Sequence, residues 1–103
     1  MKNKVPQKML LGFMQIHVLI KAKKEPFFGL GMIEELKDHG YNLSPGTVYP
    51  LLAKMESEGL LKKETRLVKG KNRHYYAITE EGNEVLLIAK EKARILFDEL
   101  DDI

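Results

Sequence analysis

Residues 43–61, LSPGTVYPLLAKMESEGLL, decide the fold of this chain. Either Ser44 or Thr47 can cap the start of a helix, and Pro45 suits a first helical position. The apolar residues then recur at the i, i+3, i+4 and i+7 spacing of one buried helical face: Val48, Leu51, Leu52 and Met55. Gly59 can take the left-handed conformation that ends a helix. The stretch therefore predicts an amphipathic helix with two alternative starts.

The opposite face of this helix is unusual for a protein surface. It carries small residues, one lysine and no carboxylate: Gly46, Pro50, Ala53, Lys54 and Ser57. A helix that enters the DNA major groove needs small residues for close approach and no acid facing the phosphates. An ordinary amphipathic helix on a small core is the alternative. Pro50 lies in the first turn if Thr47 is the cap, but inside the helix, which it should bend, if Ser44 is the cap.

Two further helices are expected before this stretch. Residues 8–24 should form a largely buried helix with a broad apolar stripe: Leu10, Phe13, Ile16 and Ile20, to which Val18 and Leu19 add. Residues 30–39 should form the second helix, with Gly40 as its stop signal. A turn of about four residues then leads into the third helix, which is the helix-turn-helix arrangement. Residues 1–7 read as a flexible N-terminal arm.

A basic β-hairpin is predicted after the third helix. Residues 60–68 and 73–79 favour strands, and residues 69–72 favour a turn in which Gly70 can take a positive φ. Between residues 61 and 76, six lysines or arginines stand against one glutamate. Such a wing commonly lies along the DNA backbone or enters the minor groove. Since Tyr75 and Tyr76 alternate, one of them should face the core. Residues 8–79 together predict a winged helix-turn-helix domain.

A long C-terminal helix is expected over residues 80–103, with Thr79 as its cap. Its apolar residues are spaced three and four apart as a heptad seam: Leu86, Ala89, Ala93, Leu96, Leu100 and Ile103. A winged domain of this size cannot cover so long an apolar helix, so we expect dimerisation through it. A helix folded back on its own domain is the alternative. The fold class is mainly α with a small β-hairpin.

Length and composition exclude several classes of protein. With 103 residues, the chain suits one domain, and the lack of cysteine excludes a disulfide framework or a thiolate metal site. Residues 1–20 faintly resemble a signal peptide, but Gln15 and His17 interrupt the apolar part, so we expect a cytoplasmic protein without a membrane segment. The three histidines are not spaced as metal ligands, and no catalytic motif is present. We therefore expect no enzyme, metal or cofactor.

Several motifs together resemble the PadR-type transcriptional regulators. They are residues 28–29 (FG), 44–52 (SPGTVYPLL), 55–61 (MESEGLL) and 73–82 (RHYYAITEEG), and the resemblance covers most of the chain from about residue 9. It implies a winged-helix repressor that binds DNA through its third helix and wing and dimerises through its C-terminal helix, aided by the first. The single C-terminal helix resembles the short subfamily. Phe28 stands where the family usually has tyrosine, so a hydroxyl contact is lost there. Ala53 stands where a larger polar or basic residue is common, so the resemblance does not imply base readout at that position.

The predicted function is a homodimeric, sequence-specific regulator of transcription, a repressor, that binds double-stranded DNA at an inverted repeat. The DNA-binding residues would be Ser44, Thr47, Tyr49, Pro50 and Lys54 on the helix and Lys69, Lys71, Asn72 and Arg73 on the wing. Tyr49 could alternatively lie at the core edge. A small-molecule effector would change the angle between the two DNA-reading helices, from a pocket placed near Phe13, His17 and Phe97. A winged-helix module that binds proteins and not DNA is the rival hypothesis.

Overall fold

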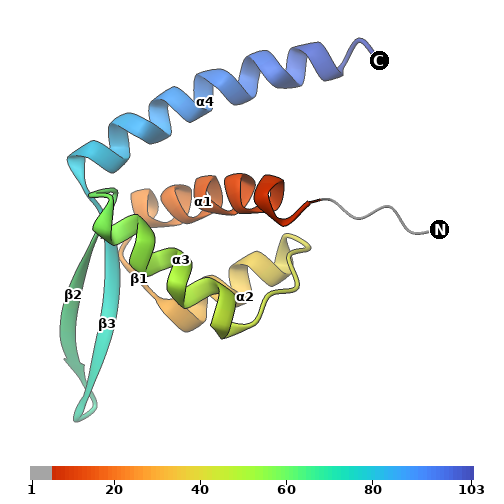
Figure 1. The fold of residues 1–103 in the computed structure, drawn as a ribbon. Coiled ribbons are helices and arrows are strands. Elements are labelled where there is room, and N and C mark those ends of the chain that lie inside the picture. The colour runs from red at the N-terminus through yellow and green to blue at the C-terminus, as the bar shows by residue number, and fades with distance from the viewer. Residues whose placement is uncertain (1–5) are drawn as a thin grey trace.

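A computed structural model describes residues 6–103, and residues 1–5 of the expected arm lie outside that range. Four helices and a small sheet follow one another along the chain (Figure 1). Their bounds are α1 (Gln7–Lys24), β1 (Phe27–Phe28), α2 (Gly29–Asp38), α3 (Pro45–Ser57), β2 (Leu61–Val68), β3 (Lys71–Ile78) and α4 (Glu80–Leu100). Helices α1 to α3 and the sheet form the winged domain, and α4 runs alongside α1 in the opposite direction, on the side away from the hairpin tip (Figure 1). The mainly helical fold with a hairpin is therefore confirmed.

The core of the winged domain is built from helix faces that the sequence pattern identified only in part. The predicted inward face of α3 is buried in full: Val48, Leu51, Leu52 and Met55. The expected apolar stripe of α1 is buried only in part: Val18 and Leu19 are buried, whereas Phe13 and Ile20 are 47% and 39% exposed. The face that α1 turns to the core also contains Met14 and Ala22, which the prediction did not name. Helix α1 thus carries two apolar faces, of which the winged domain covers one.

The start of α3 settles the two alternatives for Pro50. The helix begins at Pro45, with Ser44 in the N-cap position, so the reading with Thr47 as cap is wrong. The Ser44 side chain makes no capping hydrogen bond, and its backbone carbonyl accepts from the N–H groups of Thr47 and Val48. Pro50 therefore lies inside the helix. Gly59 has φ +81° just after the helix, as expected for its stop.

The sheet has three antiparallel strands in the order β1-β3-β2, and sequence patterns missed β1. Phe27 and Phe28 pair with Tyr76 and Tyr75 of β3. The predicted turn at residues 69–72 is too long: Val68 pairs with Lys71, so only Lys69 and Gly70 form the turn. Both have positive φ, +51° and +77°, which matches the twist of a two-residue hairpin loop. The longer strands fix the side-chain directions of the wing.

The junction between the winged domain and α4 is closely packed. The Thr79 hydroxyl donates to the carbonyl of Gly59 and accepts from the N–H of Gly82, at 2.9 Å for the latter. This confirms Thr79 as the cap and ties the end of α3 to the start of α4. Gly82 is buried, and a Cβ added there would lie 2.2 Å from the carbonyl oxygen of Leu60. In the part of the chain that the structure describes, no helix has the length and apolar character needed to cross a membrane.

Candidate nucleic-acid interface

The outward face of α3 is open, small and free of acid. Ser44, Pro45, Gly46 and Pro50 are exposed, as are Ala53 and Lys54 further along. Thr47 is half-buried, so its hydroxyl is only partly accessible. Glu56 is half-buried and turned toward β2, where it lies 3.9 Å from the Lys63 ammonium. The only full charge on this face of the helix is thus the Lys54 ammonium, which suits approach to phosphates.

Tyr49 lies at the edge of the core, as one of its two alternatives predicted, and is also partly accessible. Its ring lies over Gly29 at the start of α2, where a Cβ would come within 2.2 Å of the ring atom Cε1. The side chain is nevertheless 42% exposed. Because Gly29 has no side chain, the Tyr49 ring can pack directly on its backbone at the edge of the core, and the outer part of the ring stays accessible. Sequence patterns had pointed to the tyrosine but not to its glycine partner.

Helix α1 also borders the α3 surface. A hollow of about 320 Å³ lies between the two helices. It is lined by Gln7, Leu11 and Gln15 of α1 and by Gly46, Thr47, Pro50, Leu51 and Lys54 of α3. Three of the predicted DNA-binding residues thus share one hollow with two glutamines that sequence analysis did not select. The sequence did contain an indication of this, because a glutamine on the largely apolar helix α1 is expected to face solvent or a hollow and not the core.

The two-residue turn divides the predicted wing residues between two faces of the hairpin. Successive side chains of a strand point to opposite faces. Lys71 and Arg73 therefore lie on the face of β3 that also carries Tyr75, whereas Asn72 lies on the face of Tyr76. Tyr76 is buried, which confirms that one of the two tyrosines faces the core. Burial, with smaller effects of Glu56 and Tyr49, raises the pKa of the Tyr76 hydroxyl above its usual value, so this tyrosine stays neutral.

The hairpin tip and the N-terminal end of α3 point to the same side of the molecule, opposite α4 (Figure 1). A DNA duplex on that side can meet both elements. Comparison with known proteins decides the family. The sequence model of the "Transcriptional regulator PadR-like family" matches residues 18–87. The chain is also 40% identical to transcriptional regulator Rv3488 of Mycobacterium tuberculosis over 72 residues, which are 70% of this chain and 67% of that protein.

The chain belongs to the PadR-like family of transcriptional regulators.

Solved structures of PadR-like proteins have the same fold. A PadR-like regulator from Bacillus cereus is 29% identical, with a TM-score of 0.84 over 92% of this chain and 94% of the other. A PadR-like transcription factor from Bacteroides fragilis is 26% identical, with a TM-score of 0.81 over 97% and 98% of the two chains. These matches confirm the predicted resemblance and the winged-helix fold. Family membership also confirms that the PadR-like chain is a regulator and not an enzyme.

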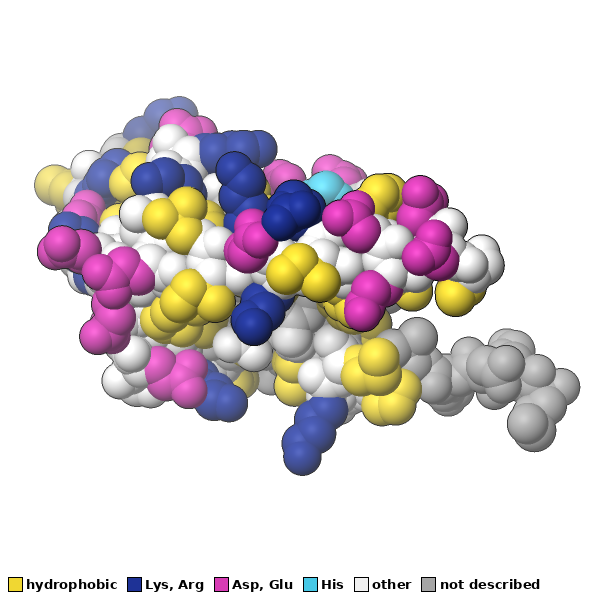
Figure 2. All heavy atoms as spheres, turned by 90° about the horizontal axis from the view of Figure 1, so that it is seen from above, with side chains coloured by type: hydrophobic (Ala, Val, Ile, Leu, Met, Phe, Trp, Pro, Cys, Tyr) yellow, Lys and Arg dark blue, Asp and Glu magenta, His cyan; other side chains and the backbone are white. Residues whose placement is uncertain are grey.

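The predicted dimerisation residues of this PadR-like chain differ in how far their own protomer covers them. Leu86 packs against the core of the winged domain, and Ala89 is half-buried. Leu96, Leu100 and Ile103 are exposed, as is Phe97 beside them at 67%. Figure 2 views the molecule from the α4 side and shows hydrophobic side chains among charged ones along this surface. Residues 90–103 are all exposed, so the far part of α4 does not fold back on its own domain.

The pocket predicted near Phe13, His17 and Phe97 does not form as expected, because Phe13 and His17 line different hollows. Phe13 lines a shallow apolar one with Met9, Gly12 and Ile16. His17 lines one of about 290 Å³ with Ile20, Lys21, Lys24, Glu35 and His39.

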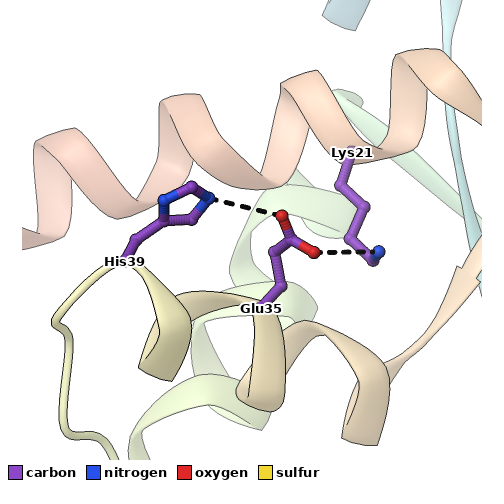
Figure 3. A network of polar contacts seen from close by, with 3 residues as sticks. All are labelled: Lys21, Glu35 and His39. Carbon is purple, nitrogen blue, oxygen red and sulfur yellow. Dashed lines mark hydrogen bonds and ion pairs between the residues drawn. The ribbon is translucent and has the colours of Figure 1, made fainter.

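A polar network surrounds this second hollow (Figure 3). Glu35 lies between Lys21 and His39, with N···O distances of 3.4 and 3.3 Å. The ring of His39 stacks on that of His17, with 4.5 Å between centroids, although the two are far apart in sequence. Burial, and then the charge of His39, hold the pKa of His17 below its usual range, against a weaker opposite effect of Glu35. Among residues 6–103 no group of three side chains is arranged to hold a metal ion.

Proposed function

We propose that this PadR-like regulator is a homodimeric repressor that binds an inverted-repeat operator through α3 and the wing. The observation that carries the proposal is the position of the N-terminal end of α3 and of the basic hairpin tip on one side of the molecule (Figure 1). The positive groups of that surface include Lys54, Lys69 and Lys71, all of them exposed. An α-helix fits the major groove, and lysines outside it fit the phosphates. The two α3 helices of a dimer would then enter successive major grooves about 34 Å apart.

The exposed apolar groups on α4 and α1 support the dimer. In addition to the heptad seam, Met9 and Phe13 of α1 are exposed, and α1 and α4 lie side by side (Figure 1). Burying apolar surface is the main favourable term in association, and a second copy offers a matching self-complementary face. A regulator that acts on DNA also implies a cytoplasmic location. An effector that releases the dimer from DNA is part of the same proposal, with the hollow around His17 as its candidate site.

The first test is selection of bound duplexes from a random DNA library at about physiological ionic strength, where non-specific phosphate binding is weak. Recovery of an inverted repeat with half-sites about one helical turn apart is the expected result. A failure to enrich any sequence, with or without candidate effectors, would favour the rival protein-binding module.

The selected duplex then tests the wing directly. Lys71→Ala removes one exposed charge next to the hairpin turn. The slope of log affinity against log salt should fall by about 0.9 for each half-site if Lys71 contacts a phosphate. The matched control is Lys90→Ala, an equal change of charge on exposed α4, which should leave the slope unchanged. Equal slopes for Lys71→Ala and the wild type would remove the wing from the interface.

A further inference from the structure

Cations outnumber acids in the hollow around His17. Two lysines, Lys21 and Lys24, line it against one carboxylate, that of Glu35, so its net charge is +1 with both histidines neutral. Each of the two histidines that line it, His17 and His39, adds a further positive charge when it takes up a proton. The hollow therefore lacks the negative charge that would balance its lining.

The one carboxylate of the hollow is held loosely. Glu35 lies 3.4 Å from the Lys21 ammonium and 3.3 Å from Nε2 of His39 (Figure 3). Hydrogen bonds between ions are usually about 2.7–2.9 Å long. In the part of the chain that the structure describes, Lys24 has no carboxylate partner. A lysine ammonium has three N–H donors, so Lys21 and Lys24 both keep donors for a second anion.

Rings and an isoleucine give the hollow a partly apolar wall. His17 and His39 stack on each other, and the ring of Tyr41 meets that of His17 at 5.5 Å between centroids. Ile20 adds apolar surface beside them. The volume of about 290 Å³ corresponds to roughly ten water molecules, at about 30 Å³ each. A phosphate ion would fill only part of this space, which leaves room for a small organic group next to the rings.

The hollow joins α1 to the end of α2. His17 meets His39 and Lys21 meets Glu35, so the two helices run antiparallel here and their dipoles largely offset each other. The lining side chains therefore decide the charge of the hollow. His39 is the C-cap of α2, and only residues 40–44 separate it from α3. A ligand that holds His39 to α1 thus acts next to the segment that leads into α3.

We propose that this hollow binds the phosphate group of a small phosphorylated molecule, with Lys21, Lys24 and His39 as donors. A phosphate monoester carries close to two negative charges near pH 7 and has three terminal oxygens, which matches three donors. A carboxylate has one charge and two oxygens, so it would leave one donor without a partner. The inference rests on the proposed function, in which this hollow is the candidate effector site, and it names the chemical class of the effector.

The first test follows the imidazole Hε1 signals of the intact protein by NMR while phenyl phosphate is added at constant ionic strength, without DNA. Single His→Gln variants assign the three histidines. The signals of His17 and His39 should shift with one saturable dissociation constant, and that of His74 on the hairpin should not. Benzoate, which has the same ring with a carboxylate, should bind about tenfold more weakly because it loses one charged hydrogen bond. Absent shifts, equal shifts at His74, or equal affinity for benzoate would overturn the inference.

Two substitutions of opposite effect test the charge of the hollow. Lys24→Gln removes one donor and should weaken the binding of phenyl phosphate about tenfold. Glu35→Gln removes the competing negative charge and should strengthen binding about fivefold, a gain that a purely structural role of Glu35 would not give. Lys23→Gln and Glu34→Gln are the matched controls, since both residues are exposed and neither lines the hollow. Controls that change the affinity as much as their partners would refute the location of the site.

The outcome for DNA is measured separately. Saturating phenyl phosphate should lower the affinity of the wild type for its selected duplex, and Lys24→Gln should need about tenfold more ligand for the same effect. A wild-type protein that selects a duplex but shows no response of His17 and His39 refutes the phosphate site and leaves the proposed function in place. A protein that binds phenyl phosphate as described but selects no duplex supports the site and refutes the proposed function.

Discussion

Replacing Gly82 with alanine tests the junction that links α3 to α4. A Cβ at this position would lie 2.2 Å from the Leu60 carbonyl oxygen and 3.0 Å from Cγ1 of Ile78. The first of these neighbours is backbone, so it cannot turn aside as a flexible side chain would. To remove the clash between the added Cβ and the Leu60 carbonyl oxygen, the start of α4 must move away from Leu60 by about 1 Å. The hydrogen bond that the Gly82 N–H donates to Thr79 would lengthen with it.

The expected magnitude follows from three opposing effects. Overpacking in a closed site costs about 1–3 kcal/mol. Weakening of the Thr79 cap costs up to about 1 kcal/mol more. Alanine regains about 1 kcal/mol of helix propensity relative to glycine. The net expectation is a loss of about 1–3 kcal/mol in the free energy of unfolding. For a domain of this size, each 1 kcal/mol lowers Tm by about 4–8 °C.

The assay is thermal unfolding followed by circular dichroism, with Gly31→Ala as the matched control. Gly31 also lies inside a helix, but its added Cβ would meet only an atom of Phe28 at 4.0 Å, an ordinary contact. Propensity should therefore dominate at Gly31 and raise stability by about 0.5–1 kcal/mol. The two substitutions should change Tm in opposite directions. A Gly82→Ala protein as stable as the wild type, or more so, would refute the close packing of this junction.

Three further predictions concern the interface, the dimer and pH. Gly29→Ala should push the Tyr49 ring outward and weaken DNA binding more than stability, because that ring is half exposed and can move; unchanged binding in a DNA titration would argue against a role for its position. Phe97→Glu should dissociate the dimer in sedimentation measurements without loss of helix signal in the monomer, since Phe97 is largely exposed in its own protomer; a dimer that persists would contradict the α4 interface. Because the pKa of His17 is lowered in the folded state, its contribution to stability is present above about pH 6.5 and is lost as pH falls from there toward the folded-state pKa. His17→Gln should flatten that part of a stability–pH curve, whereas the Glu35 carboxyl, whose pKa the nearby Lys21 lowers, acts below about pH 4.5 in both proteins; parallel curves would refute the assignment.

Sequence patterns predicted the elements whose information is local. The buried face of α3 could be predicted because four apolar residues repeat at the helical spacing. Gly59 and Thr79 could be predicted as helix ends because glycine tolerates a positive φ and a threonine hydroxyl can cap a helix. The paired strands β2 and β3 could be predicted from their β-branched and aromatic residues. Residue patterns indicated which faces bind DNA and which dimerise, and the resemblance to PadR-type regulators supported the same assignment. Those residue roles remain predictions.

The features that sequence patterns missed depend on partners far along the chain. A two-residue strand such as Phe27–Phe28 has no periodicity of its own and exists because β3 offers an edge. The positive φ of Lys69 follows from the register of the hairpin and not from the residue type. The stacking of His17 on His39 requires α1 and the end of α2 to meet, which spacing within one helix cannot reveal. For the same reason, the pattern did not separate the exposed residues of the α1 stripe from the buried ones.

The position of α4 would couple DNA binding to the dimer that we propose. Its first turn is fixed to α3 through Thr79 and the packing of Gly82 on Leu60, while residues 90–103 are exposed in the protomer. Helix α4 has 21 residues and is about 32 Å long, and its own protomer covers only its first half, up to about Ala89. A tilt of about 10° at the N-terminal end of α4 moves the far end by about 5–6 Å over this length. Conversely, a dimer that fixes the far halves of two α4 helices also fixes the angle between the two α3 helices. A compound that changed how α4 lies on α1 would therefore alter the fit of both α3 helices to DNA without touching either.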